Sequence, residues 1–274
     1  MSGKLIFVAG DNLSSRSECS NLVALSQLGG LLDGEPLSGP LPVVVPGQGV
    51  EAYEREMIRA TLRRRGLPES MLADAPLPVP LPYDEVHKRN PDNVLIAGLH
   101  RVEDDLFRAT LRISDRQELV LDHSTGSHIT GMLITEAVRQ VTLAVGERYL
   151  LASSGRSRFL LNSLETKFHK FLLPLPTQLE CAVEDLRRKG PTQLRFRCRC
   201  DLIQAGTLAA SGSMDVTVMD EERADRIEAD TIRETTRALA ELHREAEDRA
   251  AQPALSGVAA PSSSRQPAAR PSVG

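Results

Sequence analysis

Two side chains of opposite charge lie three residues apart in an otherwise apolar stretch of the chain. They are Glu136 and Arg139, within the segment GMLITEAVRQ that starts at Gly131. At about 100° per residue, a helix would place Gln140 on the same side as this pair. A carboxylate on such a side can take the proton of a hydroxyl group as a general base. The guanidinium can orient that carboxylate, or it can bind a phosphate through its planar fork.

The same pair also has a purely structural interpretation. The polar side of an amphipathic helix often carries an i,i+3 ion pair, which stabilises the helix by only about 0.2–0.5 kcal/mol. Against this interpretation, the apolar residues Met132 and Leu143 would lie on the same stripe, which a solvent-facing side does not require. The sequence therefore leaves open whether Glu136 and Arg139 face water or a substrate.

Two further groups of residues near this helix could take part in chemistry. His123 and His128 flank the expected start of the helix, and each could equally be a surface residue of a loop. The segment HITG leads into the helix, whose free N–H groups could bind a carbonyl oxygen. A basic tripeptide, His87, Lys88 and Arg89, is typical of a solvated turn but would also suit a phosphate group.

The elements that must position these residues can be read from the hydrophobic pattern. The helix is expected over about residues 129–150, after two strands in residues 93–113 that surround an EDD turn. Residues 161–186 predict two more strands, interrupted at two prolines. Residues 193–203 alternate apolar residues with arginines at a period of two, which indicates a strand, and residues 208–219 would close the sheet. The order predicts an antiparallel sheet around one long buried helix.

The start of the chain has a different pattern. Strands are expected at residues 4–8 and 41–46, each followed by a helix, the first within residues 21–32 and ending at its two glycines. The segment VAGDNLSSRSE lacks the G-x-G-x-x-G spacing of a dinucleotide site, so a structural or docking module is preferred. We expect an α+β protein with these parts: an α/β module (1–72), a proline-rich linker (73–85), a sheet-and-helix domain (86–220), a charged helix (223–250) and a disordered tail (251–274).

The composition excludes several classes of function. Aromatic residues make up 3% of the 274 residues, Trp is absent and the net charge is −4, which argues against a nucleic-acid-binding protein. No apolar run approaches the roughly 20 residues that span a membrane, and the first residues lack the features of a signal peptide. The four cysteines form no C-x-x-C pair and do not group with the histidines. We therefore expect a cytoplasmic protein without a metal or a cofactor.

The motifs described above also resemble a known family. The segments DHSTGSHITGMLITEAVRQ and FHKFLLPLPTQL are similar to the helix and strand signature of hotdog enzymes that act on acyl-carrier and acyl-CoA thioesters. Within that superfamily, VHKR at the domain start and GMLITEAVRQ on the helix resemble the A-factor biosynthesis (AfsA) hotdog family. The resemblance covers about residues 85–220, and the helix motif together with the upstream His-Lys carries its specificity.

This resemblance implies a fold and a reaction. The fold would be a hotdog, and the family's Glu and Arg on the central helix match Glu136 and Arg139. Members transfer a β-ketoacyl group from an acyl carrier protein or CoA to the hydroxyl of dihydroxyacetone phosphate, on the way to a γ-butyrolactone or butenolide. On this basis we expect Glu136, Arg139 and His123 to be catalytic. Substrate-binding residues would be His87, Lys88, Arg89, His128 and Gln140.

The resemblance also suggests partners. The best-known members carry two hotdog repeats and this chain shows one, so a homodimer is expected. Acyl carrier proteins are strongly acidic, and a row of arginines on one hairpin is a candidate docking surface, although such a row is usually the solvent face of a strand. The residues of this candidate surface are Arg187, Arg188, Arg195 and Arg197.

Two other functions remain open at this point. In 3-hydroxyacyl dehydratases a histidine upstream of the helix carboxylate acts as the base, and His123 falls one residue from that position. A dehydratase or a thioesterase would therefore use His123 with Glu136. The third possibility is a hotdog module without catalytic activity that binds an acyl ligand or a carrier protein.

Overall fold

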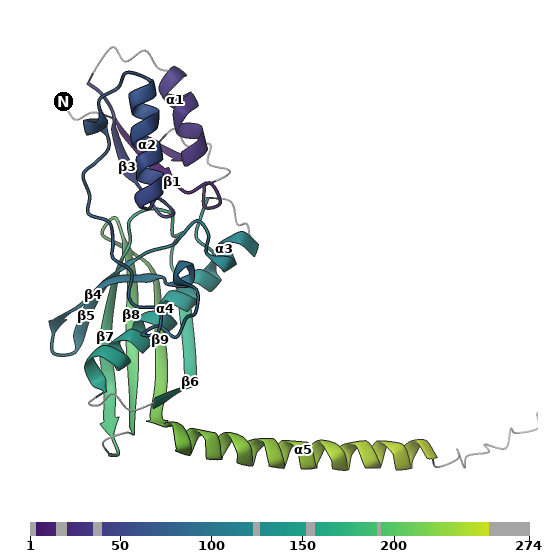
Figure 1. The fold of residues 1–274 in the computed structure, drawn as a ribbon. Coiled ribbons are helices and arrows are strands. Elements are labelled where there is room, and N and C mark those ends of the chain that lie inside the picture. The colour runs from purple at the N-terminus through teal and green to yellow at the C-terminus, as the bar shows by residue number, and fades with distance from the viewer. Residues whose placement is uncertain are drawn as a thin grey trace, which may run out of the picture. The chain divides into compact units, whose positions relative to one another are not determined.

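The computed structural model describes residues 4–14, 21–34, 40–122, 127–151, 157–190 and 193–251 of the chain. The chain divides into two units, Met1–Glu221 and Glu222–Gly274. The first unit contains a small parallel sheet and a large antiparallel sheet (Figure 1). Helix α5, Glu221–Ala251, accounts for the described part of the second unit, and its predicted helical nature is confirmed.

A three-stranded parallel sheet forms the N-terminal layer, in the order β2-β1-β3. Helix α2 covers this sheet because Ile58 and Leu62, one turn apart, are fully buried in the same apolar cluster as Val8 and Val44. The bounds of the elements are β1 Leu5–Ala9, β2 Leu22–Ala24, α1 Leu28–Gly34, β3 Val43–Pro46 and α2 Ala52–Arg64.

One prediction for this layer is wrong. Residues 21–32 were expected to form a single helix that ends at its glycines, but Leu22–Ala24 is the edge strand β2 and the helix α1 begins only at Leu28. Leu22 pairs in parallel with Phe7 of β1, and all three residues of β2 are buried. The burial of this apolar triplet in the sheet overrides its local helical pattern.

The large sheet has six antiparallel strands in the order β4-β5-β7-β8-β9-β6. Their bounds are β4 Ile96–Glu103, β5 Leu106–Leu111, β6 Ser157–Phe168, β7 Gln178–Arg188, β8 Leu194–Gln204 and β9 Thr207–Asp220. In β8, Phe196, Cys198 and Cys200 are fully buried between arginines that point to the other face, which confirms the period of two. Strand β6 lies at one edge of the sheet.

Helix α4, Gly131–Val145, packs against the large sheet and contacts β4, β5, β6 and β9 (Figure 1). It continues as one π-helical turn, Gly146–Leu150. The approach to β9 is close, because a Cβ atom at Gly212 would lie 2.8 Å from Val138 of the helix. An antiparallel sheet wrapped around a long central helix is the hotdog arrangement, so the expected α+β fold is confirmed.

Gln48, in the loop between β3 and α2, joins the two sheets. It is 7% exposed, and its side-chain amide donates a hydrogen bond to the Leu111 carbonyl (3.0 Å) and accepts one from the Ile113 N–H (2.7 Å). The adjacent Gly49 N–H donates to the Ile113 carbonyl (2.8 Å). This loop therefore extends the end of β5 by polar contacts.

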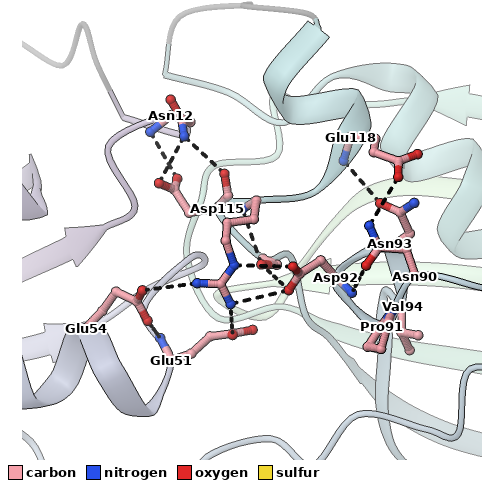
Figure 2. A network of polar contacts seen from close by, with 12 residues as sticks. Asn12, Glu51, Glu54, Asn90, Pro91, Asp92, Asn93, Val94, Asp115 and Glu118 are labelled. Atoms are coloured by element: carbon pink, nitrogen blue, oxygen red, sulfur yellow. Dashed lines mark hydrogen bonds and ion pairs between the residues drawn. The ribbon is translucent and has the colours of Figure 1, made fainter.

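A second set of contacts between the layers is polar (Figure 2). Asn12 binds Asp115, whose carboxylate accepts a hydrogen bond from the Asn12 N–H at 3.0 Å. The Arg116 guanidinium lies 3.2 Å from the Asp92 carboxylate and also forms ion pairs with Glu51 and Glu54 of the α2 start. These contacts connect the N-terminal layer to the turn η3, Pro91–Asn93, which precedes β4.

The proline-rich segment runs along both sheets. The Ala73 N–H donates to the Val44 carbonyl, and Pro80 forms an isolated antiparallel bridge with Ala97 of β4. Cys181, Cys198 and Cys200 are free thiols in the core. Among the described residues, no helix is long and apolar enough to cross a membrane, and no group of three or more His, Cys, Asp or Glu is placed to hold a metal ion.

Candidate active site

Glu136 of α4 is the centre of a cluster of charged and polar side chains. Its carboxylate lies 2.7 Å from Lys88 Nζ, and Arg139 donates two parallel hydrogen bonds to its two oxygens, each at 2.8 Å. The exposed fractions of the Glu136, Arg139 and Lys88 side chains are 16%, 24% and 25%. Bidentate geometry and partial burial distinguish this pair from the exposed i,i+3 ion pair of a solvated helix face.

Gln140, one turn further along α4, fixes this cluster to the chain before β4. The residue is fully buried, and its amide nitrogen donates to Glu136 Oε1 (2.9 Å) and to the Asn93 carbonyl (2.8 Å). Its amide oxygen accepts a hydrogen bond from the Leu95 N–H (2.8 Å). A buried amide must satisfy its polar atoms, so Gln140 determines where residues 93–95 lie relative to Glu136.

The electrostatics of the cluster set the charge on Glu136. Burial by itself would raise the pKa of the Glu136 carboxyl, but hydrogen bonds from Arg139, Lys88 and Gln140 outweigh burial and lower the pKa to about 2. The carboxylate is therefore ionised at neutral pH. A group with so low a pKa is a weak proton acceptor as long as both cations stay bound to it.

The other two residues of the basic tripeptide, His87 and Arg89, flank Lys88 in the chain but do not bind Glu136 in the described structure. His87 Nε2 lies 3.0 Å from a Glu147 oxygen, and its ring contacts Phe159 edge to face with 5.1 Å between ring centroids. The φ angle of His87 is +53°, an uncommon conformation for a residue with a side chain. Arg89 is exposed and makes no hydrogen bond or ion pair within the described residues.

Of the two histidines before α4, the structure describes only His128. His123 lies outside the described residues, so its expected catalytic role stays a prediction. His128 is half-buried three residues before the start of α4, and its ring lies 4.8 Å from the ring of Phe171, centroid to centroid. Phe171 is 77% exposed, so this aromatic contact lies at the surface of the chain.

The arginines of the candidate docking surface are brought together on β7 and β8, because Arg187 is paired directly with Arg195. Arg195 donates two hydrogen bonds to the Asp215 carboxylate (2.9 and 3.0 Å). The negative charge of Asp215 therefore compensates the positive charge of Arg195. Arg188 donates to the Leu150 carbonyl (2.9 Å). Within the described residues, Arg187 and Arg197 form no ion pair, and both line a small hollow beside Asp215.

Some contacts of the site have no signal in the sequence. Arg139 donates to the Val86 carbonyl (3.3 Å) and Gln140 to the Asn93 carbonyl, and any residue type supplies such an oxygen. Asn93 also accepts the Glu118 N–H through its side chain (3.1 Å). The dipeptide Asn90-Pro91 is a turn signal that could have located this segment, but not its contact with α4.

Comparisons with known proteins identify the antiparallel sheet and α4 as one unit. The family model of the A-factor biosynthesis hotdog domain matches residues 71–220, more than half of the chain. Among curated proteins, no sequence matches the chain significantly.

Solved structures with detectable likeness include thioesterases and a dehydratase. A thioesterase from Pseudomonas aeruginosa is 13% identical (45% of this chain, 81% of that chain, TM-score 0.33). A thioesterase from Haemophilus influenzae is 11% identical (50% and 82%, TM-score 0.33). A dehydratase heterocomplex from Xenorhabdus doucetiae is 13% identical (54% and 97%, TM-score 0.41).

The lowered pKa of Glu136 predicts a pH dependence of stability. In the unfolded chain this carboxyl has a pKa near 4.5, and in the folded chain about 2. Between these values only the unfolded state binds the proton, so the contribution is complete above pH 4.5 and is lost as the pH falls toward 2. It amounts to at most about 3 kcal/mol.

We therefore expect Glu136→Gln to lower the melting temperature at pH 7 and to approach the wild type as the pH falls below 4.5. Thermal melts of both proteins between pH 7 and pH 3 measure this difference. Glu103→Gln, at the exposed end of β4, is the control and should melt like the wild type throughout. A difference between wild type and Glu136→Gln that is constant with pH would contradict the cluster.

Proposed function

Because the chain belongs to the A-factor biosynthesis hotdog family, we propose that it is an acyltransferase for β-ketoacyl groups. The family supports a hotdog-fold enzyme that acts on thioesters. The transfer reaction and its substrates are our proposal. The donor is a β-ketoacyl thioester of an acyl carrier protein or CoA, and the acceptor is the hydroxyl of dihydroxyacetone phosphate or a similar small molecule. The ester then leads toward a γ-butyrolactone or butenolide.

The observation that carries this proposal is the Glu136 carboxylate held between Lys88 and Arg139. Two cations around one carboxylate leave a net charge of +1, which favours an anionic substrate. A phosphate would compete for both cations, and Arg139 can bind it through two parallel donors. Burial would then be the largest remaining influence on the pKa of Glu136 and would raise it.

When the phosphate of the acceptor takes the place of Glu136 at the two cations, the acceptor itself frees the base that removes its proton. Glu136, released from the two cations, takes the proton of the acceptor hydroxyl, and the oxygen attacks the thioester carbonyl carbon. The new C–O bond forms, the C–S bond breaks, and the thiolate leaves and takes up a proton. We propose that N–H groups at the start of α4, near His128, bind the carbonyl oxygen during the attack.

Substitutions in the cluster test this mechanism. Glu136→Gln keeps the size and the hydrogen-bonding atoms but removes the base, and we expect a rate about 10²–10⁴-fold lower. Arg139→Lys keeps the charge but loses the planar fork, so it should be nearly as damaging. Turnover of a β-ketoacyl thioester with dihydroxyacetone phosphate measures both effects, and circular dichroism checks the fold. Wild-type rates in both variants, with Glu103→Gln as control, would refute the proposed site.

Docking of an acidic carrier protein is proposed for the arginine-rich hairpin. Arg187 and Arg197 are the charges best suited to a partner, because Arg195 is already neutralised by Asp215. We expect the double variant Arg187→Glu/Arg197→Glu to bind an acylated carrier protein at least about 10-fold more weakly at low salt, and the difference to shrink as salt increases. Titration calorimetry measures both affinities.

The control for docking is Arg63→Glu/Arg64→Glu on α2, which changes the net charge by the same amount. This control should bind the carrier protein like the wild type. An equal loss of affinity in both double variants would mean that the net charge, and not the hairpin, governs binding.

A homodimer is proposed from the free edge of the large sheet. Strand β6 pairs only with β9 among the described strands, and its side chains Leu161 and Phe168 are 52% and 57% exposed. An open, partly apolar edge is a usual site of pairing with a second copy.

We expect light scattering of the wild type to give the mass of a dimer. Leu161→Lys should shift it toward a monomer with reduced activity, because a charge at this edge opposes pairing. Leu121→Lys, at a residue that is 61% exposed on α3 (Glu118–Asp122), is the matched control and should remain dimeric. A fully active wild-type monomer would contradict this proposal.

A further inference from the structure

A cavity of about 590 Å³ lies between the N-terminal layer and β5. Its walls are formed by residues 46–52 with Arg55, by residues 75–80 of the proline-rich segment, and by residues 110–113 with Pro176. This volume lies within the range of small-molecule sites, which is about 300–1,000 Å³. Glu136, Arg139, Lys88 and Gln140 do not line the cavity, so it is separate from the candidate active site.

Most of the wall is apolar, and three charged side chains interrupt it. They are Glu51, Arg55 and Arg112. The Arg112 guanidinium forms an ion pair with Glu51 and also donates to the Val94 carbonyl (3.0 Å), so its charge is matched. Arg55 is left as the cation without a carboxylate in the wall. The lining therefore carries a net charge of +1.

Arg55 has few partners for a buried cation. The residue is 9% exposed, and its guanidinium makes one hydrogen bond within the described residues, from one terminal nitrogen to the Ala75 carbonyl. Its Nε atom is buried and has no hydrogen-bond partner there. Burial lowers the pKa of Arg55, and the charge of Arg59 adds to this, while Asp74 acts in the opposite direction. Within the described part of the chain, most of its five N–H donors therefore have no acceptor.

We propose that this cavity binds a small carboxylate with an apolar body, of the class of medium-chain fatty acids. The carboxylate would bind the guanidinium of Arg55, and the apolar chain would lie along the proline-rich segment, where Leu77 and Val79 are 40% and 75% exposed. A guanidinium fork matches a carboxylate in shape and charge. A single negative charge balances the net charge of +1 of the wall, whereas a phosphate dianion would leave a net charge of −1.

Titration calorimetry of the full chain with decanoate tests this proposal. We expect saturable binding of decanoate to the wild type, and weaker binding of decanol, which lacks the charge. Arg55→Gln should weaken decanoate binding at least about 10-fold, since it removes a charge-assisted pair. Ala52→Trp, an exposed wall residue at the start of α2, should weaken it as well by filling space.

Three controls make the result specific. Arg59→Gln removes a charge from the same helix outside the cavity wall and should bind decanoate like the wild type. Glu136→Gln should also bind normally, and a loss there would place the ligand at the active-site cluster and overturn the proposal. Decyl phosphate that binds more tightly than decanoate would overturn the choice of a carboxylate. If Arg55→Gln fails to fold by circular dichroism, Ala52→Trp decides, and unchanged affinity in that variant overturns the proposal.

Discussion

The position of the candidate site depends on one buried amide. Gln140 lies on the side of α4 that the sheet and the chain before β4 enclose, where an unsatisfied polar group would cost about 1–3 kcal/mol. Its three hydrogen bonds meet this requirement through Glu136, the Asn93 carbonyl and the Leu95 N–H. The helix carboxylate and the chain that enters β4 are thereby held in one arrangement. Val86 precedes this segment, and its carbonyl oxygen accepts a hydrogen bond from Arg139.

The turn η3, Pro91–Asn93, connects the candidate site to the N-terminal layer. Asp92 accepts a hydrogen bond from Ser114 (3.1 Å) and forms an ion pair with Arg116, which also reaches the start of α2. Asn93, the next residue, supplies the carbonyl for Gln140. The N-terminal layer thus supports the turn from one side while α4 holds it from the other. The first layer therefore supports the candidate site although none of its described side chains forms a hydrogen bond or ion pair with Glu136.

Hydrophobic patterning predicted most of the fold: β8 buries every second residue, and α4 is an apolar run whose second half is buried on all sides. It could not predict β2, since three apolar residues carry no period and only pairing with β1 decides their conformation. The charged residues of the site were also predictable, as Glu136 and Arg139 share a helix side and Lys88 belongs to a recognisable motif. The distances between these residues could not be predicted. They depend on hydrogen bonds to backbone carbonyls, which every residue type carries.

The charge of the cluster links the structure to the proposed reaction. A carboxylate with a pKa of about 2 is a poor base, and only an anion that takes over Lys88 and Arg139 would free it. The phosphate of the proposed acceptor would be such an anion. In the proposed reaction the acceptor must therefore bind before acyl transfer, and the two cations beside the base are the groups that would bind it.

The most direct measurement is mass spectrometry of the wild-type protein incubated with a β-ketoacyl thioester, with and without dihydroxyacetone phosphate. We expect a β-ketoacyl ester of dihydroxyacetone phosphate and a matching amount of free thiol when the acceptor is present, and an unchanged thioester when it is absent. Free β-keto acid or a dehydrated acyl product formed without the acceptor would contradict this expectation. A thioester that stays intact in both reactions would contradict it as well.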